Sequence, residues 1–167
     1  MADEDTLAHI DFTFTYQRHG WATARISDGV SEYAMVPSYV PTDPMFELIH
    51  ALVDVLSYGG EARCGWYYEP ATDLWILRRD GDRLHVTILR TRESLSGPNL
   101  PSARGEVEFS TTCDLWQFAA KVRLAASRLP DLTREQDNYG PALVREDAEY
   151  RALCEFLEEH KRAKRHG

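Results

Sequence analysis

The stretch that decides the fold is IDFTFTYQRHGWATARISDGVSEYAMV, residues 10–36. Apolar and aromatic side chains occupy every second position from Ile10 to Tyr16, with Asp and Thr between them. This period of two is typical of a strand with one buried face. Arg18-His19-Gly20 and Asp28-Gly29 then interrupt the pattern, so we predict three consecutive antiparallel strands joined by tight turns.

The two turns predict which side chains share a face. A three-residue loop with a left-handed Gly20 sets Tyr16 opposite Ala22. A two-residue type I′ turn at Asp28-Gly29 sets Arg25 opposite Glu32. The same register pairs Ala24 with Tyr33 and Ala22 with Met35. The expected buried face is Phe12, Phe14, Tyr16, Ala22, Ala24, Ile26, Tyr33 and Met35, and the expected polar face carries Thr13, Arg25 and Glu32.

Four further strands are predicted at residues 62–68, 74–79, 83–90 and 105–111. With Asp80-Gly81 as a two-residue turn, Leu77 lies opposite Leu84, Trp75 opposite Val86 and Ile76 opposite His85. A three-residue loop would exchange the two faces of residues 74–77, and this alternative stays open. In the first case the core side is Trp75, Leu77, Leu84, Val86 and Ile88, and the outer side is Ile76, Arg83, His85 and Thr87.

Helices are predicted at residues 44–58, 114–129 and 146–164. Asp43 is the expected N-cap of the first, with Pro44 at its first position and Gly59-Gly60 at its end. The element order βββα-ββββ-αα predicts an α+β fold: about seven antiparallel strands in one or more sheets, with the helices packed on one face. The 167 residues suit a single domain, 1–167, with mobile tails expected at 1–8 and 162–167.

Composition narrows the range of functions. The formal net charge of −8 argues against non-specific nucleic-acid binding, which requires a basic surface. We interpret the basic stretch 160–167 as a helix C-terminus that complements the helix dipole. No apolar run approaches the length of a membrane helix, and the N-terminus is acidic. Three unevenly spaced cysteines indicate reduced thiols. We therefore expect a cytoplasmic protein without membrane or nucleic-acid partners.

The residues that carry chemistry in other proteins form no known motif here. The six histidines and three cysteines have no zinc-site spacing, and neither phosphate-binding glycine loops nor a Gly-x-Ser-x-Gly nucleophile motif occurs. Cys113 precedes a helix, where packing is its expected role. Turn chemistry accounts for Glu69, Asp73, Asp80 and Asp82. We expect no catalytic residue, cofactor or metal.

Several aromatic residues point to a contact surface instead. Trp66, Tyr67 and Tyr68 are consecutive, so they cannot all face the core. Trp21 falls on the polar face of the first three strands. Because the helices cover one face of the sheet, the opposite face is the expected partner-binding surface. Its candidate residues are Trp21, Arg25, Tyr67, Tyr68, Arg83 and His85. The Gly/Pro/Ser-rich connection within residues 91–104 is a second candidate.

Several short motifs carry a resemblance to a known family. They are Phe12-x-Phe14-x-Tyr16, Gly20-Trp21-Ala22, Ser38-Tyr39, and Glu69-Pro70 followed by Trp75 and Arg79-Asp80-Gly81-Asp82. Together they resemble an uncharacterised family of small bacterial proteins that is common in actinobacteria. The resemblance covers most of the chain up to the second helix. It implies a single compact domain in a bacterial cytosol, and no activity, cofactor or catalytic residue.

The sequence thus favours a non-enzymatic protein-binding module, for example a toxin-neutralising immunity protein, since such inhibitors are small, acidic and free of catalytic motifs. The partner is another protein or a second copy of the chain, with a homodimer about as expected as a heterologous complex. The alternative is a small-molecule-binding protein or enzyme with a pocket between sheet and helices. An apolar cavity would favour that alternative, and a flat aromatic patch would favour the first.

Overall fold

The computed structural model describes residues 6–39, 42–93, 104–129 and 144–167. Its elements follow the predicted order, with one short 3₁₀ helix, η1, in addition. They are β1 (Asp11–Tyr16), β2 (Ala22–Ser27), β3 (Glu32–Met35), α1 (Pro44–Tyr58), β4 (Glu61–Tyr67), β5 (Thr72–Asp80), β6 (Arg83–Thr91), β7 (Glu106–Asp114), α2 (Leu115–Ser127), η1 (Val144–Glu146) and α3 (Ala148–His166).

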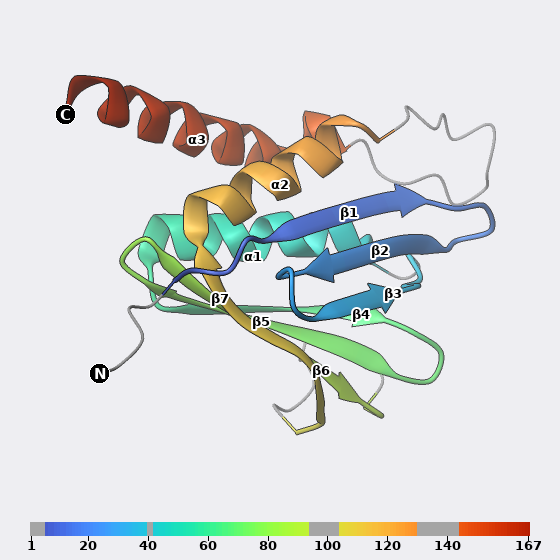
Figure 1. Ribbon diagram of the computed structural model, residues 1–167. Coiled ribbons are helices and arrows are strands. Elements are labelled where there is room, and N and C mark those ends of the chain that lie inside the picture. Colours follow the sequence, from blue (N-terminus) through green and yellow to red (C-terminus); the bar gives the residue numbers. More distant parts are fainter. Residues whose placement is uncertain (1–5, 40–41, 94–103, 130–143) are drawn as a thin grey trace, which may run out of the picture.

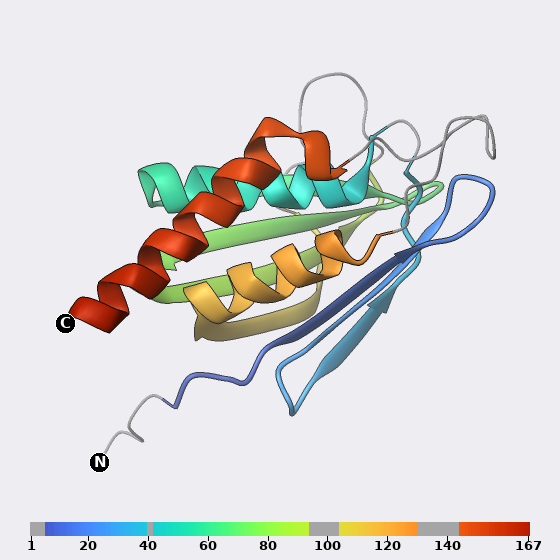
Figure 2. The same ribbon diagram turned by 90° about the horizontal axis from the view of Figure 1, so that it is seen from above.

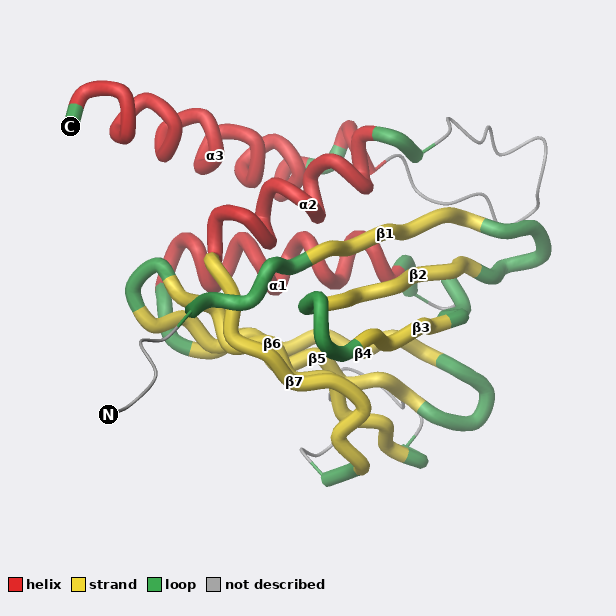
Figure 3. Tube along the Cα trace, viewed as in Figure 1, coloured by secondary structure: helices red, strands yellow, loops and turns green. Residues whose placement is uncertain are grey.

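The seven strands form two antiparallel sheets, which confirms the predicted α+β class (Figures 1 and 3). One sheet has the order β1-β2-β3 and the other the order β4-β5-β6-β7. Each is a meander in which sequence neighbours pair, as expected for strands joined by short turns. The connection within residues 91–104 is the second predicted partner-binding candidate, and its residues 94–103 lie outside the described residues.

The three helices lie on the same side of the four-stranded sheet (Figure 2). Helix α1 packs across β4 and β5, α2 lies along β1, and α3 crosses both of these helices. The three-stranded sheet stands beside the helices, so it covers part of the same face. The described helices include none that is both long and apolar enough to cross a membrane.

The core forms where the inner faces of the two sheets meet α2. The Phe12 ring lies 6.4 Å from Trp66, 6.2 Å from Trp75 and 6.2 Å from Phe118, measured between ring centroids. Each distance lies within the range in which aromatic rings attract each other. Phe14 is buried as predicted, and its ring lies 5.8 Å from Trp66 of β4. The alternating aromatic side chains of β1 therefore pack against the tryptophans of the four-stranded sheet and hold the two sheets together.

The first turn has the predicted register. Tyr16 pairs with Ala22 and Phe14 with Ala24, and Gly20 adopts a φ of 86°. His19 also has a positive φ, of 63°. The large side chains of β1 thus lie beside the alanines of β2, which leaves room for the second sheet and α2 to pack on this face.

Both Asp-Gly turns differ from the prediction by the same shift of two residues. Ala24 pairs with Met35, and Leu77 pairs with Val86, so the central turn residues are Gly29-Val30 and Gly81-Asp82. Because a shift of two preserves the side-chain alternation, both predicted buried faces are retained.

The reason for the shift is the conformation of the turn. A type I′ turn needs positive φ at both central residues, whereas type II′ needs it only at the first, which is usually Gly. Gly29 and Gly81 have φ values of 86° and 61°. Among the described residues His19 is the one non-glycine residue with positive φ, so both turns are of type II′. The Asp28 carboxylate accepts hydrogen bonds from the amides of Val30 and Ser31 and holds its turn closed.

The predicted helix boundaries agree with the structure at α1 and lie within two residues of it at α2 and α3. The Asp43 carboxylate accepts from the amides of Met45 and Phe46, and Pro44 is the first residue of α1. The Asp114 carboxylate caps α2 by accepting from the Gln117 amide. Helix α3 buries Leu153 and Leu157 and continues to His166, where its basic last turn complements the helix dipole.

Candidate functional site

A buried carboxylate lies at the junction of the two sheets. Asp73 on β5 is completely buried, although the sequence had predicted a turn residue there, and that prediction is wrong. Asp73, Trp75 and Leu77 are two residues apart along β5, so their side chains point to the same face of the sheet, the one that packs in the core. A buried carboxylate requires hydrogen-bonding or charged partners.

Strand β3 of the other sheet and the neighbouring strand β6 provide those partners. The Tyr33 hydroxyl on β3 donates to Asp73 over 2.9 Å. The Arg90 guanidinium on β6 donates through Nε over 3.1 Å and through Nη2 over 3.4 Å. Asp73 therefore ties the edge strand of the three-stranded sheet to the interior strands of the other sheet.

Arg90 is the member of this cluster that reaches solvent. Its side chain is 39% exposed, and its guanidinium carbon lies 4.7 Å from the ring centroid of Tyr68 and 5.8 Å from that of Tyr33. Burial alone would lower the pKa of Arg90, but the hydrogen bonds and charge of Asp73 raise it. Arg90 is thus a permanent cation held between two aromatic rings and a carboxylate.

Burial and the Asp73 charge also act on the two tyrosines. Burial is the larger cause of a raised pKa at both Tyr33 and Tyr68, and the negative charge of Asp73 raises each pKa further. Both hydroxyls therefore stay protonated at physiological pH. The Tyr68 hydroxyl is buried beside the Asp73 carboxylate. The cluster is suited to holding a fixed shape and charge.

A short segment after β3 links the two sheets at the next position along the junction. The Ala22 amide donates to the Pro37 carbonyl, and the Ser38 amide donates to the Tyr67 carbonyl, each over 2.8 Å. Trp21 forms an isolated bridge with Ser38. Trp21 and Tyr67, which the sequence assigned to one contact surface, therefore lie on either side of the Ser38 backbone.

Partly exposed side chains along this junction project from both faces of the two sheets, and we refer to these residues together as the seam surface. Trp21 is 38% exposed, and Val36, two residues before Ser38, is 51% exposed. Tyr33, Tyr67 and Tyr68 are half-buried. The seam surface consists of Trp21, Tyr33, Val36, Tyr67, Tyr68 and Arg90.

The remaining predicted contact residues lie elsewhere. Arg25 is on the outer face of the three-stranded sheet, where it pairs with Glu32 across a diagonal and not directly opposite it as predicted. Arg83 and His85 are on the outer face of the four-stranded sheet, and His85 Nδ1 lies 2.8 Å from Thr112 Oγ1. On that face Leu74 is fully buried, so the outer face is not open along its whole length.

The sequence contained a signal for the residues that were missed. Each missed residue is two positions from a core residue of its own strand and therefore points to the same buried face. The pairs are Asp73 with Trp75, Arg90 with Ile88, and Tyr33 with Met35. Charged or polar residues on a buried face require partners, so three such positions indicate a shared cluster. Which strands meet there depends on the packing of the two sheets.

The thiols and potential metal ligands are not gathered into a site in the described ranges. No group of three or more His, Cys, Asp or Glu side chains there could hold a metal ion. Cys113 lies near the end of β7 and is completely buried, and burial raises the pKa of its thiol to about 12. The helix-packing role predicted for Cys113 thus agrees with its surroundings.

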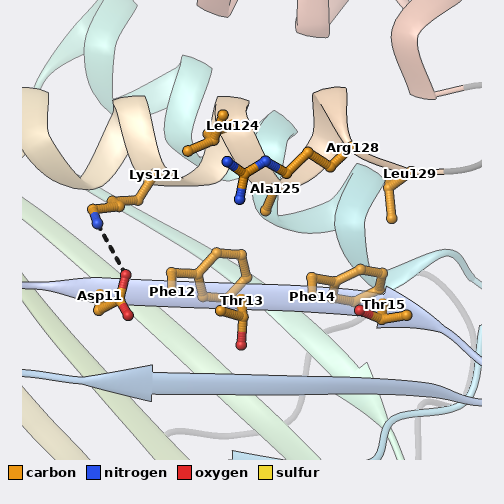
Figure 4. A pocket seen from close by; sticks show the side chains of 10 residues that line it. All are labelled: Asp11, Phe12, Thr13, Phe14, Thr15, Lys121, Leu124, Ala125, Arg128 and Leu129. Atoms are coloured by element: carbon orange, nitrogen blue, oxygen red, sulfur yellow. Dashed lines mark hydrogen bonds and ion pairs between the residues drawn. The ribbon is translucent and has the colours of Figure 1, made fainter.

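A groove of about 360 Å³ lies between β1 and α2, in the place that the small-molecule alternative requires (Figure 4). Its lining is Asp11, Phe12, Thr13, Phe14, Thr15, Lys121, Leu124, Ala125, Arg128 and Leu129. The apolar part comes from both elements, Asp11 and Lys121 lie at one end, and the Arg128 guanidinium lies over the middle (Figure 4). The groove and the seam surface lie at the two opposite edges of the three-stranded sheet, β1 and β3.

No protein-family model matches the chain, and no curated protein matches it. Among solved structures, the chain is similar to one described as the CdiA-CT/CdiI toxin and immunity complex from Enterobacter cloacae. The match covers 72% of this chain and 99% of the matched chain, with 12% sequence identity and a TM-score of 0.44.

Proposed function

We propose that this chain is a protein-binding module whose partner contacts the seam surface. The observation that carries the proposal is Arg90, which stays solvent-accessible while Asp73 and two tyrosine rings hold it in place. Trp, Tyr and Arg dominate the binding energy of protein interfaces, and all three residue types occur among the residues of the seam surface.

Pre-organisation strengthens this interpretation. A long side chain that becomes ordered on binding loses about 0.5–1.5 kcal/mol of conformational free energy. The hydrogen bonds from Arg90 to Asp73 already restrict its guanidinium in the free protein. A partner that approaches Arg90 therefore meets a surface whose shape is set in advance.

The specific form that we propose is an immunity-type inhibitor that binds and neutralises a toxin. A net charge of −8 attracts a basic partner and accelerates its association. Toxins that act on nucleic acids need a basic surface, so an acidic inhibitor complements them in charge. Self-association through the seam surface is the other outcome that the test distinguishes.

The test uses the protein encoded next to this chain in its genome as the probe. Isothermal titration measures its dissociation constant for the parent chain and for the double variant Trp21→Ser/Tyr67→Ser. We expect the double variant to bind at least tenfold more weakly, because both aromatic rings flank Ser38 on the proposed contact surface.

Val30→Ser is the matched control. Val30 is 96% exposed at the β2–β3 turn and lies outside the seam surface, so its loss should leave the affinity unchanged. Urea unfolding of both variants checks the fold. Equal affinity of the double variant and the parent chain would contradict the seam surface. A neighbouring gene product that does not bind would contradict the immunity-type form, and a parent chain with twice its sequence mass in solution would support a homodimer.

A further inference from the structure

Strand β1 is an edge strand of the three-stranded sheet. Hydrogen-bonded and non-hydrogen-bonded pairs alternate in an antiparallel ladder. Because the Gln17 amide bonds to the Trp21 carbonyl, the backbone groups of Thr15 and Thr13 point toward β2. Those of Phe14 and Phe12 therefore point away from it, toward the free edge.

These outward groups face the groove between β1 and α2 (Figure 4). The hydrogen bond from Lys121 is the largest cause of the lowered pKa of Asp11, and the neighbouring Phe12 amide lowers that pKa further. The Phe14 amide, the Phe14 carbonyl and the Phe12 carbonyl have no hydrogen-bond partner within the described part of the chain. An unpaired edge of this kind is a template for another strand.

The dimensions of the groove suit an extended segment. Residues 11–15 line it on the β1 side, and five residues of strand extend over about 17 Å. Leu124, Ala125 and Leu129 provide an apolar wall from α2. A strand in this position would pair with β1 on one side and rest alternate side chains on that wall.

The two cations that line the groove differ in their partners. Lys121 donates to the Asp11 carboxylate over 3.0 Å, so one end is already neutralised. Arg128, the C-cap of α2, is exposed, and its guanidinium lies over the middle of the groove (Figure 4). Within the described ranges its guanidinium has no ion pair or hydrogen-bond acceptor. The groove therefore offers a cation over its middle in a protein whose net charge is negative.

We propose that β1 binds an extended segment of a partner protein as an added strand, with a carboxylate of that segment at Arg128. The proposal rests on the proposed protein-binding function and adds a second contact at the opposite edge of the same sheet. Main-chain hydrogen bonds to Phe14 and Phe12 supply affinity, and the carboxylate selects the sequence and its direction.

The experiment uses the full chain and a phage-displayed library of unconstrained dodecapeptides as the probe. We expect selected peptides to carry at least one Asp or Glu between β-branched residues. Amide hydrogen exchange followed by NMR then reports on the edge itself. The Phe14 amide should exchange rapidly in the free chain and at least tenfold more slowly with a saturating selected peptide.

Arg128→Glu should weaken peptide binding at least tenfold, because it replaces an attraction with a repulsion. Arg165→Glu makes the same charge change on an exposed residue at the end of α3 and should have no effect. A Phe14 amide that is already protected in the free chain would overturn the proposal. So would selected peptides without a carboxylate, or peptides that leave the Phe14 exchange rate unchanged.

The two proposals fail separately. Loss of partner binding in Trp21→Ser/Tyr67→Ser with no Phe14 protection by any peptide would leave the seam surface intact and reject strand addition. Peptide binding with Phe14 protection, unaffected by that double variant, would support strand addition and reject the seam surface. Phe14 protection that depends on protein concentration alone would show β1 pairing with a second copy and would overturn the proposal of a partner segment.

Discussion

The Arg90 guanidinium and the Asp73 carboxylate form an ion pair in which one partner is 39% exposed and the other is completely buried. This asymmetry means that the two residues have different effects on stability. Without Asp73, Arg90 can turn toward water. Without Arg90, the Asp73 carboxylate stays in the interior with Tyr33 as its remaining donor.

We therefore expect Arg90→Ala to lower the free energy of unfolding by about 3 kcal/mol, because it leaves a buried charge without its counter-ion. Asp73→Asn should lower it by about 1–2 kcal/mol, since an amide retains the shape and an acceptor for Tyr33. Urea unfolding at pH 7 measures both. A larger loss in Asp73→Asn than in Arg90→Ala would contradict this account of the pair.

Phe14→Ala should lower the free energy of unfolding by roughly 3–5 kcal/mol, because it removes a buried ring from the contact with Trp66. Thr13→Ala on the exposed face of the same strand is the control and should have little effect. Thermal unfolding followed by circular dichroism compares the two. Equal melting temperatures for Phe14→Ala and the parent chain would mean that the two faces of β1 are reversed.

Asp43 should make stability depend on pH. Burial raises the pKa of its carboxyl from 3.8 to about 6, against the opposing effect of the hydrogen bonds from Tyr16 and the α1 amides. The folded state then binds more protons than the unfolded state between about pH 4 and pH 6. The stabilisation from this group is thus complete below pH 4 and is lost as the pH rises through 6.

The loss over this window should be of order 2–3 kcal/mol, from a shift of about two pKa units. Asp43→Asn keeps a good N-cap and an acceptor for Tyr16 but cannot titrate. Urea unfolding at pH 4, 5, 6 and 7 should show the parent chain losing stability relative to Asp43→Asn as the pH rises. Parallel pH profiles for the two proteins would show that Asp43 does not titrate in this range.

The thiols should differ in reactivity. Cys64 and Cys113 are completely buried and burial raises the pKa of each, while Cys154 on α3 is half-buried. Because the thiolate is the reactive form, Ellman's reagent should label at most Cys154 in the native protein and all three thiols in urea. Cys154→Ser should abolish the native signal. Rapid native labelling of Cys113 would mean that β7 opens at its end.

The faces of the strands could be predicted from the sequence because side-chain alternation is a local property. Phe12, Phe14 and Tyr16 alternate with Asp and Thr, so their shared face follows from the strand itself. Residues 74–77 are apolar at every position, so the face of Trp75 and Leu77 depended on the length of the loop at Asp80-Gly81. The exact pairing at Asp28-Gly29 and Asp80-Gly81 could not be predicted. Turns of types I′ and II′ place glycine one position apart and shift the pairing by two residues, and a shift of two leaves every buried face unchanged.

The sequence by itself determined the element order, the caps of α1 and α2, and which side of β1 is apolar. Only the tertiary structure decided that the strands divide into two sheets, that Asp73 meets Tyr33 and Arg90 at their junction, and that β1 has a groove along its free edge. The physical reason is the distance along the sequence over which each interaction acts. Alternation and capping depend on neighbours within a few residues, whereas Tyr33 and Asp73 are 40 positions apart, and their contact exists only because Phe12 and Phe14 pack the two sheets together.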